Sequence, residues 1–330
     1  MSFFLLRRLS TGVLILLILS FVIFLLQSVA PGDPARAYVG ANASPAVVAE
    51  ERQRLGLNDP VSSQFLHFLG GLFTGDLGRS LRTRQAVTAD MATYLPATVE
   101  LVVAAFLLAL VFAAAYALSG ALRWPGASIG RGVLLLLAAA PPFLLALIGI
   151  IVFFGQLGWL PARGVGDFQD PGPFGMQVVD TLVHGQADAF VDAVRHLLLP
   201  ALVLSIAPAV AIGRVFRSSL QSVLHVDYVR TARSKGLTEW QVITHHVVRN
   251  AIGPALSMSG LQLGFMFAGV VVVEQIFSWP GIGNYLAASI PVSDFPAIAG
   301  VTLVLGAIYV LAGVVVDLLQ AVADPRIAAE

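Results

Sequence analysis

The sequence predicts an all-helical membrane protein with six spanning helices. Of its 330 residues, 57% are hydrophobic and only 12% are charged, whereas soluble domains average roughly 25% charged residues. Six apolar segments reach the length of about 20 residues that a helix needs to cross a hydrocarbon core about 30 Å thick. The chain also lacks cysteine, which excludes disulfides, thiolate catalysis and cysteine-bound metals.

The predicted spans follow one another along the whole chain. They are residues 9–30, 95–118, 132–154, 197–216, 251–277 and 296–319. A cleaved secretory signal is the alternative interpretation of the first span, because Arg7 and Arg8 precede it and Ser28-Val29-Ala30 ends it. Its apolar stretch is longer than the roughly 7–15 residues of a signal core, which favours a span.

The distribution of positive charge predicts that both termini are cytoplasmic. With the N-terminus inside, eleven of the nineteen Lys and Arg residues fall in cytoplasmic segments, as the positive-inside rule requires. The loop 31–94 carries six outer arginines, but loops of about 60 residues or more are translocated largely regardless of charge. The chain thus divides into a first span (1–30), an extracytoplasmic loop region (31–94) and a five-helix core (95–330) that contains a cytoplasmic loop (220–250).

Two outer segments are too long to be simple connectors. The stretch "FLHFLGGLFTG" in residues 65–75 is too short to span and predicts an interfacial helix or hairpin. Residues 155–196 are rich in Gly, Pro and Asp and predict a partly ordered outer loop.

The cytoplasmic segment "DYVRTARSKGLTEWQVITHHVVRN", residues 227–250, contains the start and stop signals of two helices. Asp227 is the predicted N-cap of a helix that ends near Lys235, and Gly236 suits the left-handed residue after a helix end. Thr238 and Gln241 have the spacing of a capping box for the next helix. The segment is therefore predicted to be a rigid elbow of two helices about a glycine corner.

The second helix of this elbow is predicted to be amphipathic. Leu237 and Val242 have the spacing of a hydrophobic staple, and the expected apolar side carries Trp240, Ile243, Val247 and Val248. A solvated positive loop would explain the charge but not the caps, and a DNA-reading helix-turn-helix would need a third helix for its core. The remaining interpretation is a docking element for a cytoplasmic protein, with no role for nucleic acid.

The elbow and six further strings resemble one family of transporters. "YVRTARSKGL" is similar to the cytoplasmic EAA-type loop of ABC-importer permeases, in the form found in the dipeptide/oligopeptide/nickel transport family. In chain order, "APGDPA", "GDLGRSL", "LPATVEL", "LGWLPARG", "IFSWPGIGNYL" and "DPR" resemble the same family. Arg230-Thr231-Ala232 replaces the Glu-Ala-Ala of the general importer pattern, and Pro254 comes later than in sugar-importer permeases, as in the peptide-type branch.

The resemblance implies a type I ABC-importer permease fold in the cytoplasmic membrane. It implies a second homologous permease, two P-loop ATPase subunits that bind ATP and Mg, an extracytoplasmic substrate-binding protein and membrane lipid as partners. It implies short peptides as cargo, with nickel, glutathione or another small polar cargo as alternatives. The residues implied in coupling to the ATPases are Asp227, Tyr228, Ala232, Lys235, Gly236, Leu237 and Trp240.

Searches for catalytic motifs predict that the chain is not an enzyme and has no cofactor of its own. A phosphate-binding loop requires Lys followed by Ser or Thr, but Gly236 follows Lys235, which is the only lysine. The G-x-S-x-G pattern at residues 126–130 lies between two apolar spans instead of at a strand-to-helix turn, which argues against a hydrolase. His245 and His246 are adjacent, so their rings diverge on a helix and do not form a metal site.

Two acidic residues inside spans are candidates for the gate or the pathway. Glu100 and Glu274 are costly to place in a membrane, and intramembrane acids are often functional. Both are expected in the outer third of their helices, where a structural acid is an equal alternative. An ion-coupled secondary transporter is the alternative from another class, but it would favour charges near the midplane and paired broken helices.

Small residues in the fifth span predict close helix packing. Gly260, Gly264 and Ala268 recur every four residues and so share one helix face. The sequence leaves open whether the neighbouring helix belongs to this chain or to a partner.

Overall fold

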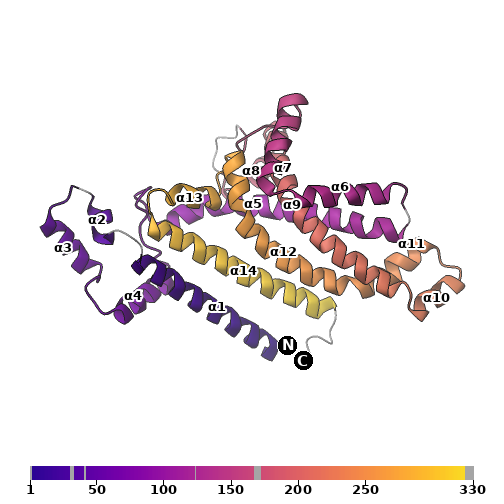
Figure 1. Ribbon diagram of the computed structural model, residues 1–330, viewed down its shortest axis with the longest axis horizontal. Coiled ribbons are helices and arrows are strands. Elements are labelled where there is room, and N and C mark those ends of the chain that lie inside the picture. Colours follow the sequence, from indigo (N-terminus) through magenta and orange to yellow (C-terminus); the bar gives the residue numbers. More distant parts are fainter. Residues whose placement is uncertain (1, 30–32, 41, 123, 167–171, 324–330) are drawn as a thin grey trace.

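The computed structural model describes residues 2–29, 33–40, 42–122, 124–166 and 172–323, and this part of the chain is helical with only turns and loops between (Figure 1). Five helices are long and apolar enough to cross a membrane. They include or lie within α1 (Ser2–Val29), α5 (Val87–Ala121), α9 (Ala187–Val223), α12 (Val248–Phe277) and α14 (Phe295–Ala323). They coincide with five of the six predicted spans.

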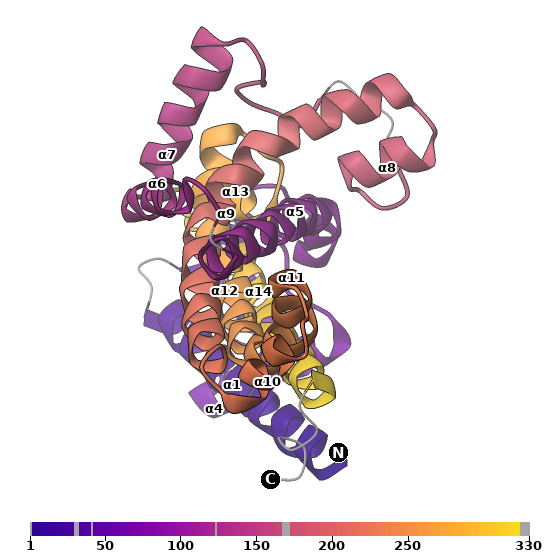
Figure 2. The ribbon, with the colours of Figure 1, turned by 90° about the vertical axis from the view of Figure 1, so that its right-hand side faces the viewer.

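The third predicted span is a bent pair of helices instead of one straight helix. α6 (Ala127–Ala139) is followed by α7 (Pro142–Gly149) and the π-helical turn η1 (Ile150–Gln156), with a bend of 112° between the two parts. Pro141-Pro142 causes the break, because proline lacks an N–H and forces the preceding Ala140 into an extended conformation, with ψ 142°. The described residues thus hold five spans, or six when the bent pair counts as one; Figure 2 shows α7 rising away from α6.

The centre of the bundle is the packing of α5 against α9. A stripe of alanines spaced by four on α5 is almost completely buried: Ala105, Ala109, Ala113 and Ala117. Their small side chains let α9 approach closely. Gly213 of α9 meets the ring of Tyr116 so closely that a β-carbon there would lie 3.0 Å from it. Span prediction depends on apolar length alone, which does not distinguish this stripe from the rest of the helix.

The predicted glycine face of the fifth span packs within this chain. A β-carbon on Gly260 would lie 2.6 Å from Val316 of α14, and one on Gly264 would overlap the ring of Tyr309. Gly260 and Gly264 are buried, and they bring α12 and α14 together. Ala268 was expected on the same interface, but it is exposed, because a step of four residues rotates gradually around a helix of 3.6 residues per turn.

Short helices cover the end of the bundle that lies away from the elbow. They are α2 (Pro34–Val39), α3 (Pro45–Arg54), α4 (Val61–Thr74), α8 (Gln177–Val183) and α13 (Ile282–Ser289). Helix α4 corresponds to the predicted interfacial segment, and its Phe65 ring lies 5.3 Å from that of Phe24 on α1. Helix α8 lies in the predicted partly ordered loop.

Asp33 in the "APGDPA" string is the N-cap of α2. Its carboxylate accepts a hydrogen bond of 3.0 Å from the Ala35 N–H and forms an ion pair of 3.0 Å with Arg52 of α3. The hydrogen-bonded Arg52 guanidinium holds the pKa of Asp33 below its usual value. The Asp33 carboxylate thus caps α2 and also anchors α3, which explains why residue 33 is an acid.

The two ends of the bundle are clearly separated (Figure 1). The start of α1, the end of α14 and the elbow helices α10 (Asp227–Ser234) and α11 (Glu239–Gln241) lie toward one end, called here the elbow end. Helices α2, α3 and α13 lie toward the other, called the far end. The start of α1 and the end of α14 thus lie on the side of the elbow, as the predicted topology requires, and which side is cytoplasmic stays a prediction.

Candidate functional site

The first helix of the elbow begins one residue earlier than expected. Val226 occupies the N-cap position of α10 without a side-chain hydrogen bond, and Asp227 is the first helical residue. The prediction of Asp227 as N-cap was therefore wrong. Its carboxylate still lies in the first turn, where negative charge is favourable to the helix dipole, and it is 3.7 Å from the Arg230 guanidinium.

The corner of the elbow has the predicted chemistry. Gly236 has a φ of 79°, a conformation that residues with a β-carbon rarely adopt, and its N–H donates to the Arg233 carbonyl at 3.0 Å. The capping box is confirmed, because the Gln241 N–H donates to Thr238 Oγ1 at 3.3 Å and the Thr238 N–H donates to Gln241 Oε1 at 3.0 Å. A left-handed glycine between the end of α10 and the capped start of α11 thus forms a defined bend.

The second arm of the elbow is continuous with a membrane span. Helix α11 passes into the π-helical turn η2 (Val242–Val247) and then into α12 without a break. Residues Glu239–Phe277 therefore form one helix of 39 residues. A displacement of the elbow would move this whole helix, because no flexible loop separates them.

The inner side of the elbow packs on the ends of α5 and α9. Val229, Ala232, Val242 and Val247 are buried and share one cluster with Phe216 and other residues of those helices. Ala232, predicted as a coupling residue, is thus used in packing inside the chain. Trp240 was predicted to lie on this apolar side, and this prediction was wrong, because Trp240 is 58% exposed. Val242 is buried there. The π-helical turn shifts the register of side chains by about one residue, which a regular helical pattern does not foresee.

The outer side of the elbow presents the other predicted coupling residues. Tyr228 and Trp240 are large apolar side chains exposed at 41% and 58%, and Asp227, Lys235 and Gly236 are exposed around them, while Leu237 is half-buried. Exposed aromatic residues beside a tight corner are typical of protein contact surfaces. Their role in coupling stays a prediction.

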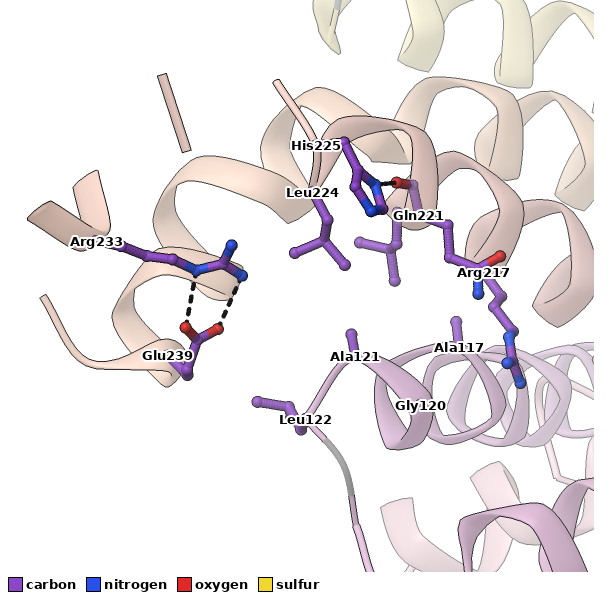
Figure 3. Close-up of a pocket in the computed structure, with 11 residues that line it drawn as sticks. Ala117, Gly120, Ala121, Leu122, Arg217, Gln221, Leu224, His225, Arg233 and Glu239 are labelled. Atoms are coloured by element: carbon purple, nitrogen blue, oxygen red, sulfur yellow. Dashed lines mark hydrogen bonds and ion pairs between the residues drawn. The ribbon is translucent and has the colours of Figure 1, made fainter. Parts of the chain in front are cut away.

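A cavity of about 630 Å³ lies between the elbow and the ends of α5 and α9 (Figure 3). On the elbow side, Arg233 and Glu239 form a two-point ion pair across the corner, with Nε–Oε1 at 2.8 Å and Nη2–Oε2 at 3.1 Å. The pair joins α10 to α11 and fixes the angle between them. The opposite wall includes Arg217 and Gln221 of α9 and His225 in the turn after it.

At the far end, Glu274 is buried completely and hydrogen-bonded within the chain. Its carboxylate accepts from Thr98 Oγ1 on α5 at 2.6 Å and from the Asn284 N–H at 2.9 Å. Thr98 Oγ1 in turn accepts from the Ile282 N–H at 2.8 Å. These bonds join α5, the end of α12 and the start of α13.

The string "IFSWPGIGNYL" wraps around the Glu274 carboxylate. A β-carbon on Gly281 would overlap both carboxylate oxygens, and one on Gly283 would lie 2.9 Å from Oε2 and 2.7 Å from the Val271 Cα. Both glycines are thus required for close approach. Trp279 is buried and its indole N–H donates to the Ala97 carbonyl at 2.8 Å.

Glu100 holds a different far-end segment. Its Oε1 accepts from the N–H groups of Val178 and Val179 at 2.7 Å and 3.3 Å, in the first turn of α8. Oε2 is buried and has no hydrogen-bond partner among the described residues. Both candidate acids are therefore used to attach far-end segments to α5 and α12, and a role for either in the pathway stays a prediction.

Sequence reasoning missed two buried acids at the far end. Asp294 accepts hydrogen bonds from Ser80 Oγ and from the Arg82 N–H, which attaches the "GDLGRSL" turn to the segment before α14. Asp90 accepts from the Tyr285 hydroxyl at 2.8 Å, and burial raises the pKa of Tyr285 above its usual value. The "GDLGRSL" and "NYL" strings were visible, but their partners are about 200 residues away.

Four of the strings that resemble the transporter family thus meet in space, while "DPR" (residues 324–326) lies outside the described residues. The turn with Ser80, the α5 residues Thr98 and Glu100, and the loop around Glu274 are all at the far end. The "LGWLPARG" string joins them, because the Gly164 N–H donates to the Phe277 carbonyl at 2.9 Å. The elbow lies at the other end.

Comparison with known sequences assigns both halves of the chain. Residues 117–329 match a family described as "Binding-protein-dependent transport system inner membrane component", and residues 1–102 match the N-terminal part of such membrane components. A dipeptide transport system permease protein of Alkalihalophilus pseudofirmus is 38% identical over 97% of this chain and 98% of its own.

Two other relatives differ in the cargo that their names state. A di/tripeptide transport system permease protein of Pseudomonas aeruginosa is 41% identical over 92% of both chains. A glutathione transport system permease protein of Salmonella choleraesuis is 34% identical over 98% of both chains.

Proposed function

The chain belongs to the family of inner membrane components of binding-protein-dependent transport systems, and from this premise we propose that it takes up short peptides as one permease half of an ATP-driven importer. The family consists of multi-pass transporter subunits of the inner membrane and not of enzymes, so the chain itself catalyses no covalent step. Its relatives are permease subunits of ABC importers.

The observation that carries the mechanism is the continuity of the elbow with α12. The outer side of α10 and the Gly236 corner dock on an ATPase subunit, with Tyr228 and Trp240 as the main contacts. The inner side is packed on α5 and α9 through Val229 and Ala232. Closure of the ATPases would therefore press on a stiff element and not on a loop.

Helix α12 transmits this displacement to the far end. Its 30 residues correspond to roughly 45 Å at 1.5 Å per residue. Glu274 lies one turn before the end of α12 and is hydrogen-bonded to both Thr98 and Asn284. A displacement of the elbow is thus transmitted along α12 to the loop that precedes α13. We assign Glu274 and Glu100 a structural role, in which they hold the segments that open and close the outer gate.

The proposed partners supply the ATP binding that this chain lacks and the other parts that an importer of this family requires. A second permease completes the pathway, two P-loop ATPases supply ATP and Mg²⁺, and an extracytoplasmic binding protein delivers cargo. The chain has no phosphate-binding loop around Lys235, so ATP is bound by the partners. The predicted cytoplasmic location of both termini and of the elbow places the ATPases on the elbow side.

Short peptides are the proposed cargo, because the names of three similar relatives specify dipeptides or di- and tripeptides. Glutathione is the second candidate, since another relative's name specifies it and glutathione is itself a tripeptide. Nickel complexes are a third alternative. We assign no residue to contact with cargo.

The test is uptake by the complete system in proteoliposomes. We expect labelled dipeptide to accumulate only with ATP and with the binding protein present, and to be unaffected by an ionophore that dissipates ion gradients. Accumulation of glutathione or nickel instead of dipeptide would change the cargo but keep the importer. Uptake by this chain alone, driven by an ion gradient, would contradict the proposal and favour a secondary transporter.

A further inference from the structure

The cavity behind the elbow carries positive charge that the described residues do not neutralise. Its elbow wall is balanced, because Arg233 is paired with Glu239. Its opposite wall contains Arg217, for which no ion pair or hydrogen bond is found in the described part of the chain. Figure 3 shows Arg217 extending from α9 toward α5 beside Ala117.

A second arginine, Arg131 of α6, lies close to Arg217 beside Gly120, just outside the residues that line the cavity. A β-carbon on Gly120 would be 3.4 Å from Arg131 Nη1 and 3.5 Å from Arg217 Cζ. The two guanidinium groups therefore lie over the same glycine, well within the screening length of about 10 Å in 0.1 M salt. Arg131 donates a hydrogen bond of 3.1 Å to Ser119 Oγ, and no carboxylate of the described residues pairs with it. Both arginines are half-buried.

Two like charges held this close favour an anion between them. The planar guanidinium group donates two parallel hydrogen bonds to phosphate, which makes paired arginines a common phosphate site. Gly120 leaves the space beside them free of a side chain, and the Gln221 side chain lines the same wall. Three helices, α5, α6 and α9, hold the pair in place, so the site does not depend on a flexible loop.

We propose that Arg131 and Arg217 bind a phosphate group, and that an anionic phospholipid head group supplies it. The pair lies where α5 ends, α6 begins and the long apolar part of α9 ends, which is the level of lipid head groups for spans of this length. The elbow end also carries the predicted cytoplasmic charge, and anionic lipids of the inner leaflet attract such basic clusters. Free phosphate is the other source of the same chemistry.

A bound head group would connect the elbow to the bundle. The cavity is bounded by α5 and α9 on one side and by the Arg233–Glu239 pair on the other. Its occupant would therefore stiffen the packing of α10 and α11, and transport would depend on anionic lipid. Only this consequence rests on the proposed transport function; the binding itself does not.

Binding can be measured on the full chain purified in detergent, by native mass spectrometry with added phosphatidylglycerol or phosphatidylcholine. We expect the unmodified chain to prefer phosphatidylglycerol, and the Arg131→Gln/Arg217→Gln double variant to bind it about tenfold or more weakly. Arg214→Gln is the matched control, because Arg214 is exposed one turn earlier on α9, and it should change the affinity less than about twofold. Helical content by circular dichroism checks folding.

Two further measurements keep the test decisive. Gly120→Val fills the space beside both guanidinium groups without removing charge, and it should weaken binding as the double variant does. Inorganic phosphate that binds the unmodified chain but not the double variant, with no preference among lipids, would support the phosphate site and identify free phosphate as its source. Equal affinity of all variants for phosphatidylglycerol, with no binding of inorganic phosphate, would overturn the proposal.

Discussion

The hydroxyl group of Thr98 donates a hydrogen bond of 2.6 Å to the carboxylate of Glu274, 176 residues later in the chain. The same Thr98 oxygen accepts from the Ile282 N–H, and the same carboxylate accepts from the Asn284 N–H. Two side chains thus join two spanning helices to the first turn of α13. This small network is the point where the motion proposed for α12 meets the far end.

Removing the Glu274 carboxylate should loosen the far end. Glu274→Ala leaves the Asn284 N–H and the Thr98 hydroxyl without an acceptor, which costs about 2–3 kcal/mol of unfolding free energy, and Glu274→Gln about 1 kcal/mol because one acceptor oxygen remains. Equilibrium unfolding in detergent measures both. Gln275→Ala is the control, because Gln275 is the exposed neighbour; if it costs as much as Glu274→Ala, the network does not contribute as described.

A methyl group at Gly281 should damage the same network from the loop side. Its β-carbon would overlap the Glu274 carboxylate, so Gly281→Ala must displace either the loop or the acid, at a cost of about 1–3 kcal/mol. Gly269→Ala is the matched control: Gly269 lies within α12, has free space around it, and alanine there should be neutral or stabilising by up to about 1 kcal/mol. Thermal unfolding of the two variants should shift in opposite directions or by clearly different amounts, and equal shifts would contradict the packing.

Substitutions at Gly236 should produce a graded loss of coupling. Gly236 has a φ of 79° and open space around it, so within this chain only the backbone conformation limits which residue fits. Asparagine tolerates this conformation and should keep most ATP-driven uptake. Alanine should cost about 1 kcal/mol at the corner, and proline, with φ fixed near −65°, should abolish co-purification with the ATPases. If all three substitutions impair uptake equally, the cause would be contact of the added side chain and not the backbone conformation.

The Arg233–Glu239 pair should matter for coupling more than for stability. The two side chains are 42% and 59% exposed, so breaking the pair costs only about 0.2–1 kcal/mol of unfolding free energy. Arg233→Glu should nevertheless reduce ATP-driven uptake, because it loosens the angle between α10 and α11. The exchange Arg233→Glu/Glu239→Arg should restore uptake in a double-mutant cycle. If the exchanged pair remains as impaired as the single variant, Arg233 contacts a partner subunit instead of fixing the elbow.

The sequence was sufficient wherever the controlling interactions are local. Apolar length alone located five spanning helices, since each must satisfy its own backbone in the membrane. The capping box of Thr238 and Gln241 and the left-handed Gly236 were predicted because a cap involves residues three or four apart. Local patterns failed where helix geometry is irregular: Trp240, just before the π-helical turn, is exposed, and the Pro141-Pro142 break bends the third span.

The far end shows what only the tertiary structure decided. The sequence contained "GDLGRSL", "LPATVEL", "LGWLPARG" and "IFSWPGIGNYL" as separate strings, and two acids whose roles were open. In the fold they form one assembly, in which Glu274 bonds to Thr98, Glu100 to the start of α8, and Asp294 to the turn at Ser80. Such contacts join residues about 80 to 210 positions apart, and no periodicity in the chain encodes them, because they depend on how the helices pack.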